Sequence, residues 1–184
     1  MDSTQLISSL TSDTRKCIAL ALALSEKSPE YLTRRPEPNA WNILECIQHL
    51  NLYGAFYIPE IKNAIQKSTS LPEKEFHPGW LGDYFAKSMA PKENLNKMNT
   101  FKDKNPIHSF LDKKVLDVFL TQQSELLETL EMSNQVSLNK VRIGTTLSRL
   151  IRLKLGDTFR FFINHQMRHV EQINKIITKM QEEK

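Results

Sequence analysis

Two histidines four residues apart are the first sign of chemistry in this sequence. His165 and His169 lie in a segment whose apolar residues recur with helical spacing, and residues four apart in a helix share one face, one turn from each other. Most of their neighbours on that face are apolar, so both imidazoles are expected to point into the protein interior. The pair can therefore share a ligand in a largely apolar environment.

A third histidine is expected to face inward from another helix. His49 lies in an apolar helical pattern in which Glu45 is the only charged neighbour. Three neutral imidazoles that meet between two helices can bind a divalent first-row metal and leave a further position for water or substrate. We therefore predict a Zn²⁺ or Ni²⁺ site formed by His49, His165 and His169. The alternative is that each histidine only forms a buried hydrogen bond.

Polar residues near the three histidines are candidates for supporting roles. Those one turn from a ligand on the same helix face could orient the imidazoles, and they are Glu45, Thr158 and Gln172. Arg168 flanks the histidine pair and could bind a substrate carboxylate, although a surface salt bridge is equally compatible with its position. Glu45 and Arg168 are the candidate catalytic residues.

Two other classes of metalloprotein fit the sequence poorly. The zinc-protease motif needs a glutamate directly after the first histidine of the pair as general base, and Gln166 occupies that position. A di-iron carboxylate protein needs Glu-x-x-His on two helices and two further glutamates. Here Glu45 lies four residues before His49, and the last predicted helix has no inward-facing carboxylate.

Helices must position these side chains. The length of 184 residues corresponds to one domain over residues 1–184, and the chain has only 5 glycines and few valines, which favours helices over strands. Apolar spacing predicts an all-α fold, a four-helix bundle with helices at about 6–28, 40–67, 106–132 and 157–180.

Prolines and a capping residue mark the expected ends of the helices. Residues 29–38 hold three prolines and are predicted to be extended, with Asn39 as the cap of the following helix. Pro59 should kink or split that helix. A polar turn is expected at 133–139, whereas the periodicity of residues 141–155 does not decide between an extended piece and a short helix.

Residues 68–106 form a long crossover between the second and third predicted helices. Connections of this length usually act as lids or binding loops, and we expect this one to pack onto the bundle with a short helix at 82–89. The sequence around His77 and His108 has no helical periodicity that would indicate which way their side chains face. We therefore do not include these two histidines in the predicted site. The aromatic residues of the crossover are Phe76, Trp80, Tyr84, Phe85 and Phe101.

Charge, cysteine content and the lack of long apolar runs limit the binding partners and cellular compartments that the sequence suits. The chain has 25 Lys and Arg against 21 Asp and Glu, a net charge of +4 without a concentrated basic stripe, which argues against nucleic-acid binding. Cys17 and Cys46 form no CxxC pair and are expected as buried free thiols, as suits a reducing cytoplasm. The first residues do not resemble a secretory signal, and no apolar run is long enough to span a membrane.

Several runs of the sequence resemble the DinB/YfiT-like family of small bacterial metalloproteins. The resemblance lies in residues 41–51, 78–82, 156–160 and 165–172 and extends over most of the chain. It implies a four-helix bundle, commonly a homodimer, in which a histidine of the second helix and a His-x-x-x-His of the last long helix bind a divalent metal. Characterised relatives include S-transferases that use the thiol bacillithiol and isomerases that depend on mycothiol.

These observations lead to one hypothesis with two alternatives. The hypothesis is a metal-dependent enzyme in which a thiolate or hydroxide at the open metal position attacks an electrophilic carbon of a small molecule, with thiol S-transfer as the family-level expectation. The first alternative is a metal-hydroxide hydrolase that needs no thiol. The second is a non-catalytic helical dimer whose buried histidines bind nothing and whose aromatic crossover forms the dimer surface.

Overall fold

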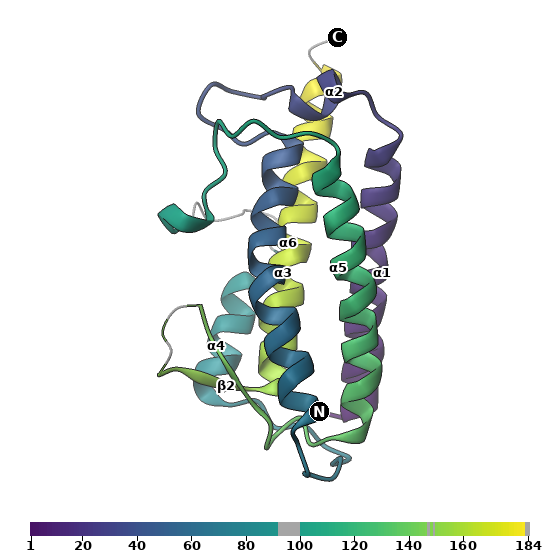
Figure 1. The fold of residues 1–184 in the computed structure, drawn as a ribbon, viewed down its shortest axis with the longest axis vertical. Helices are drawn as coiled ribbons and strands as arrows, with labels where there is room; N and C mark the ends of the chain where they lie inside the picture. The colour runs from purple at the N-terminus through teal and green to yellow at the C-terminus, as the bar shows by residue number, and fades with distance from the viewer. Residues whose placement is uncertain (92–99, 147, 149, 183–184) are drawn as a thin grey trace.

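Four long helices lie side by side along the longest axis of the molecule (Figure 1). The computed structural model describes residues 1–91, 100–146, 148 and 150–182. In chain order the long helices are α1 (Ser3–Ser25), α3 (Ile43–Gln66), α5 (Lys114–Met132) and α6 (Leu155–Glu182). α3 packs against α5 and α6, and α1 packs against the same two helices. The prediction of a mostly helical fold is confirmed.

Short elements connect the long helices and correct the all-α expectation. Two antiparallel strands, in register with Ile143 opposite Leu153, occupy the segment whose periodicity was undecided. Three residues in each strand are too few to show an alternating pattern. The short elements are α2 (Pro29–Thr33), α4 (Trp80–Met89), the 3₁₀ turns η1 (Lys102–Lys104) and η2 (Ser133–Gln135), and the strands β1 (Arg142–Gly144) and β2 (Arg152–Lys154).

The observed helix starts differ from the predicted ones for identifiable reasons. Residues 29–33 are helical and not extended, because Ser28 accepts the Tyr31 N–H and proline suits the first helical position. α3 begins at Ile43 and not after Asn39, because Asn42 and Glu45 form a reciprocal capping box.

Three further details differ from the prediction. Of the two effects expected of Pro59, splitting of the helix does not occur, because α3 is held by buried side chains on both sides of the proline. α5 begins eight residues later than the predicted start at 106. α6 begins at Leu155, two residues before the predicted start at 157.

The apolar core consists of two clusters that are stacked along the helices. One cluster surrounds Tyr57 and Phe162, and the other surrounds Leu50 and Phe119. Between the clusters, the fully buried residues of α1, α5 and α6 are polar: Thr14, Gln123 and Gln166. On α6, His165 and His169 lie between Ile163 of one cluster and Val170 of the other, and on α3 His49 lies next to Leu50. A polar layer therefore divides the core in the middle of the protein.

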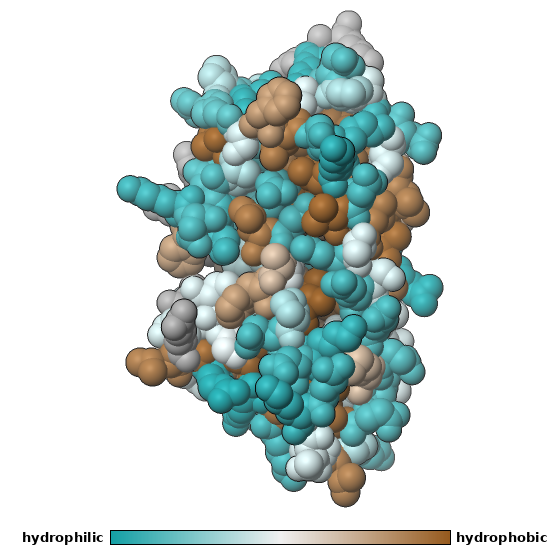
Figure 2. Space-filling view, viewed as in Figure 1, coloured by the Kyte–Doolittle hydropathy of each residue, from teal (hydrophilic) through white to brown (hydrophobic). Residues whose placement is uncertain are grey.

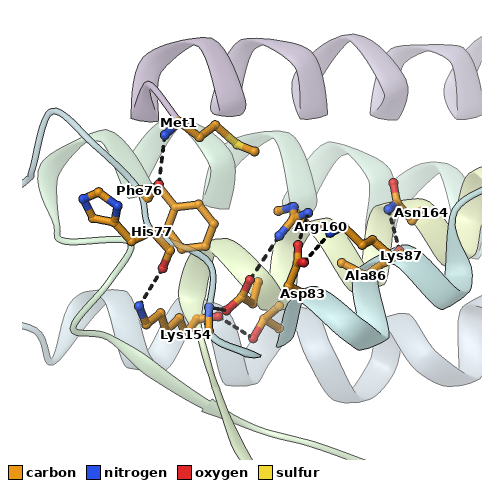
Figure 3. A network of polar contacts seen from close by, with 12 residues as sticks. Met1, Phe76, His77, Asp83, Ala86, Lys87, Lys154, Arg160 and Asn164 are labelled. Carbon is orange, nitrogen blue, oxygen red and sulfur yellow. Dashed lines mark hydrogen bonds and ion pairs between the residues drawn. The ribbon is translucent and has the colours of Figure 1, made fainter. Parts of the chain in front are cut away.

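α4 is attached to the first half of α6 by a polar network (Figure 3). Asp157 accepts the Gly79 N–H at 2.7 Å, and Arg160 bridges Asp157 and Asp83 at 3.2 and 2.8 Å. Further along α6, Asn164 donates to the Ala86 carbonyl at 2.9 Å. These contacts confirm the predicted short helix and show that this part of the crossover packs on α6.

The aromatic residues of the crossover divide into packed and exposed ones. Phe76 is fully buried and Phe85 packs against the core, as expected. Trp80, Tyr84 and Phe101 are 87%, 62% and 52% exposed, so these three aromatic residues do not contribute to the packing expected of the crossover. Residues 92–99 of the predicted crossover lie outside the described residues.

The surface carries mixed side chains. Figure 2 shows polar and apolar residues interspersed over the face in view. Among the described residues, no helix combines the length and the apolar character that crossing a membrane requires.

Candidate metal centre

The three predicted ligands meet in the polar layer of the core. His49 extends from α3, and His165 and His169 extend from α6. The Nε2 atom of His165 lies 3.2 Å from Nε2 of His49 and 3.1 Å from Nε2 of His169. All three side chains are buried, and one ring nitrogen from each lies within 4.8 Å of the others. The sequence prediction that these residues converge is confirmed.

Two of the three separations between the ring nitrogens suit a small divalent ion. Two nitrogens that each lie about 2.0–2.1 Å from a tetrahedral zinc are roughly 3.3 Å apart. The two shorter nitrogen separations of this centre, 3.1 and 3.2 Å, lie close to this value. The donor set also fits, because imidazole is a common ligand of zinc and nickel.

Hydrogen bonds at the outer ring nitrogens fix which nitrogen of each histidine faces the centre. His49 Nδ1 donates to the Lys104 carbonyl at 2.7 Å, and His169 Nδ1 donates to Gln172 Oε1 at 2.8 Å. Each neutral ring carries its proton on Nδ1, so the Nε2 lone pairs of both rings point toward His165. A cation would accept all of these converging lone pairs, whereas a single N–H at His165 Nε2 can donate a hydrogen bond to only some of them.

His165 differs from the other two ligands in its outer nitrogen. In the part of the chain that the structure describes, His165 Nδ1 is buried and has no hydrogen-bond partner. Metal-binding histidines usually donate this second N–H to an acceptor. His49 and His169 follow that pattern and His165 does not.

The surroundings keep all three imidazoles neutral at neutral pH. Burial lowers the pKa of His49, places the pKa of His165 well below 6.5 and lowers the pKa of His169 to about 3. The positive charges of Lys104 and Arg168 act in the same direction. Neutral imidazole is the form that binds a metal.

Two aromatic rings enclose the histidine cluster from either side. The Trp41 ring lies 4.8 Å from the His49 ring and 5.9 Å from the His169 ring. The Tyr53 ring lies 4.8 Å from the His165 ring. The i,i+4 spacing of His49 and Tyr53 was a readable signal for the second wall, whereas Trp41 precedes α3 and no helical spacing indicates its place.

A short segment, residues 104–108, passes over the cluster, and we call it the strap. Besides the Lys104 carbonyl on His49, Asn105 Oδ1 accepts the Trp41 indole N–H at 3.0 Å. His108 has a φ of 60°, a left-handed conformation that is uncommon outside glycine. The strap supplies the hydrogen-bond acceptor for one ligand and fixes the indole beside it. The sequence does not indicate this role, because a residue of any type can supply a backbone carbonyl.

Glu45 holds the strap in place. Its carboxylate accepts two hydrogen bonds from Arg35, at 2.7 and 2.8 Å, and one each from the backbone N–H groups of Asn42 at 2.8 Å and His108 at 2.6 Å. Burial alone would raise the pKa of Glu45, but these donors outweigh it and hold the pKa below its ordinary value. The His49 ring is hydrogen-bonded to the Lys104 carbonyl and to His165, so Glu45 acts on His49 through the strap.

The other predicted supporting residues lie in different places. Gln172 is the acceptor for His169, as expected. Thr158 donates its hydroxyl proton to the carbonyl of Lys154, the last residue of β2, and not to one of the three histidines. Arg168 is buried next to the histidine pair, where its charge lowers their pKa values. His77 is exposed and lies near Glu75 at 3.6 Å, apart from the cluster.

The fold and the cluster together define a helical protein with a possible metal site formed by three buried histidines. The sequence model of the DinB superfamily matches residues 14–173. The chain therefore belongs to the DinB superfamily. Searches among curated proteins and among solved structures return no significant match.

Proposed function

We propose that this protein is a metal-dependent enzyme built on a four-helix bundle, with His49, His165 and His169 as ligands of Zn²⁺ or Ni²⁺. The observation that carries the proposal is the convergence of three buried Nε2 atoms, two of them fixed as lone-pair donors by the hydrogen bonds of their outer nitrogens. Three protein ligands leave at least one position open, as in catalytic zinc sites.

The ion would supply the nucleophile. Zinc lowers the pKa of a bound water to about 7, and a coordinating thiol loses its proton outright, so no separate side-chain base is required. We propose a low-molecular-weight thiol such as bacillithiol as the co-substrate and a small electrophile as the substrate, in an S-transfer reaction.

The chain's own residues would prepare this chemistry. The Lys104 carbonyl and Gln172 hold two of the rings in place, and Trp41 and Tyr53 limit the access of water. Arg168 supplies a buried cation that could bind a substrate carboxylate. Glu45 serves as a positioning residue through the strap.

Metal analysis of protein prepared without a histidine tag tests the proposal. We expect one equivalent of Zn²⁺ or Ni²⁺ after reconstitution and a higher melting temperature with the ion than without it. His169→Ala should fold but lose the metal, because two imidazoles make a weak site. His77→Ala is the matched control and should keep it, since His77 is exposed and outside the cluster. Wild-type protein that takes up no metal, and melts at one temperature in its presence and absence, would overturn the proposal.

The reaction is tested separately, after metal binding. Reconstituted protein is assayed with an electrophilic substrate with and without added thiol. Turnover that requires the thiol supports S-transfer. Turnover of activated esters that does not depend on thiol would favour the hydrolase alternative, and a loaded protein inactive in both assays would count against an enzyme.

We also propose that the protein forms a homodimer. The exposed aromatic residues Trp80 and Tyr84, one turn apart on α4, support this assembly. In analytical ultracentrifugation the wild type should be a dimer, and Trp80→Ser should dissociate into monomers at a higher concentration than the wild type does. A monomeric wild type at micromolar concentration would contradict it.

A further inference from the structure

Lys104 contributes to the metal centre with both its backbone and its side chain. While its carbonyl accepts the proton of His49 Nδ1, its ammonium group lies 6.0 Å from the centre of the Tyr53 ring. Tyr53 is in turn in contact with the rings of His49 and His165, at 5.0 and 4.8 Å. The Lys104 side chain is only 19% exposed. The ammonium is therefore directed along the wall of the centre.

Cationic side chains lie beside the centre. Lys104 places its ammonium 6.0 Å from the centre of the Tyr53 ring, and the buried Arg168 directly precedes His169 in α6. The carboxylate of Glu45 is neutralised by Arg35. A bound divalent cation would add to this positive field, which favours a ligand with negative charge.

The ammonium of Lys104 is available to a ligand. Its ion-pair partner is Asp103 at 3.5 Å, whose side chain is 73% exposed, and an ion pair with such an exposed partner is weak. The ammonium also lies 6.0 Å from the centre of the Tyr53 ring, and this ring contacts the imidazoles of His49 and His165. One aromatic ring therefore joins the cation to two of the imidazoles.

We infer that Lys104 determines specificity by binding a carboxylate of the ligand whose donor atom occupies the open metal position. The ligand class is a small thiol that carries a carboxylate a few bonds from its sulfur. This inference rests on the proposed function, because it requires a metal that accepts the thiolate. Lys104 and Arg168 are placed by different parts of the fold, because Lys104 belongs to the strap and Arg168 to α6.

Two probe thiols of the same length test the inference. Protein reconstituted with Co²⁺ is titrated with 3-mercaptopropionate and with 3-mercapto-1-propanol, and the thiolate-to-metal absorption band reports binding. We expect the wild type to bind the carboxylated thiol about tenfold more tightly. Lys104→Met keeps the aliphatic stem on Tyr53 and the carbonyl on His49 but removes the charge, and it should lose the preference while its affinity for the neutral thiol stays unchanged.

Lys102→Met is the matched control, because Lys102 lies exposed in the same short turn η1. It should retain the tenfold preference. Equal affinity of the wild type for the two thiols would overturn the inference and leave the metal site intact. The same conclusion would follow if Lys104→Met and Lys102→Met lost the preference for the carboxylated thiol to the same extent. If the protein bound no Co²⁺, or bound it without responding to either thiol, the proposed function itself would fail and the inference with it.

Discussion

Replacing Glu45 with glutamine is the most informative single change in this protein. The Glu45 side chain is fully buried and accepts hydrogen bonds from Arg35, Asn42 and His108. A glutamine of nearly the same shape removes the charge and turns an N–H₂ group toward N–H donors. The change therefore breaks a buried ion pair and leaves at least one buried donor without an acceptor.

The expected loss of stability follows from the burial of the pair. Removing one partner of a buried ion pair costs about 3–5 kcal/mol. Arg35 is 20% exposed and can regain some hydration, so we expect the lower end, about 3 kcal/mol. For a domain of this size, 1 kcal/mol corresponds to about 2–4 °C in melting temperature, which gives a decrease of roughly 6–12 °C.

Thermal unfolding followed by circular dichroism at pH 7 measures this decrease. Glu37→Gln is the matched control, because Glu37 also pairs with a cation, Lys179, at 2.7 Å but is exposed. That variant should melt close to the wild type. If Glu45→Gln lowered the melting temperature no more than Glu37→Gln does, the reasoning from buried charge would be refuted.

The difference between the wild type and Glu45→Gln should depend on pH with a defined sign. The pKa of Glu45 in the folded protein lies below its ordinary value of 4.5. Its contribution to stability is therefore fully present above about pH 4.5 and is lost as the pH falls through the folded-state pKa. The two melting temperatures should stay separated from pH 6 to pH 8 and approach each other in acid. The same variant frees the strap, so it should also weaken metal binding, by about 10–100-fold.

Three further predictions concern other parts of the structure. Gly156→Ala should destabilise the protein by about 1–3 kcal/mol, because an added Cβ would lie 2.6 Å from the Phe76 ring; Gly144→Ala, which meets open space, should be nearly neutral in the same denaturant titration. Gln172→Ala should lower metal affinity about 10–100-fold without unfolding the protein, since His169 loses its acceptor, and an unchanged affinity in a chelator competition would contradict the orienting role. Burial raises the pKa of both cysteine thiols, so neither should react with Ellman's reagent at pH 8 until the protein is unfolded, and rapid labelling of the folded protein would contradict the assigned burial.

The convergence of the three histidines could be predicted from the sequence because each lies on a strongly periodic helix. Helical spacing gives the inward faces of His49, His165 and His169, and in the structure these faces meet in the core. The Asn42-x-x-Glu45 capping box was also a readable signal for the start of α3.

The supporting interactions could not be predicted in the same way. The strap reaches His49 through a backbone carbonyl 55 residues away, and such a contact depends on the path of the chain and not on residue type. The contact between Glu45 and the strap has the same origin, since its partner His108 contributes a backbone N–H. The choice between strand and helix stayed open for residues 141–155 because strands of three residues are too short to show an alternating pattern.

The order of the three histidines along the chain bears on how the proposed centre would acquire an ion. His165 follows His49 by 116 residues, so α1 to α5 are synthesised before the second and third imidazoles. An ion that needs all three histidines would therefore bind only after most of the chain is made. The geometry of the finished cluster, together with the ions present at that late stage, would then decide which metal is bound.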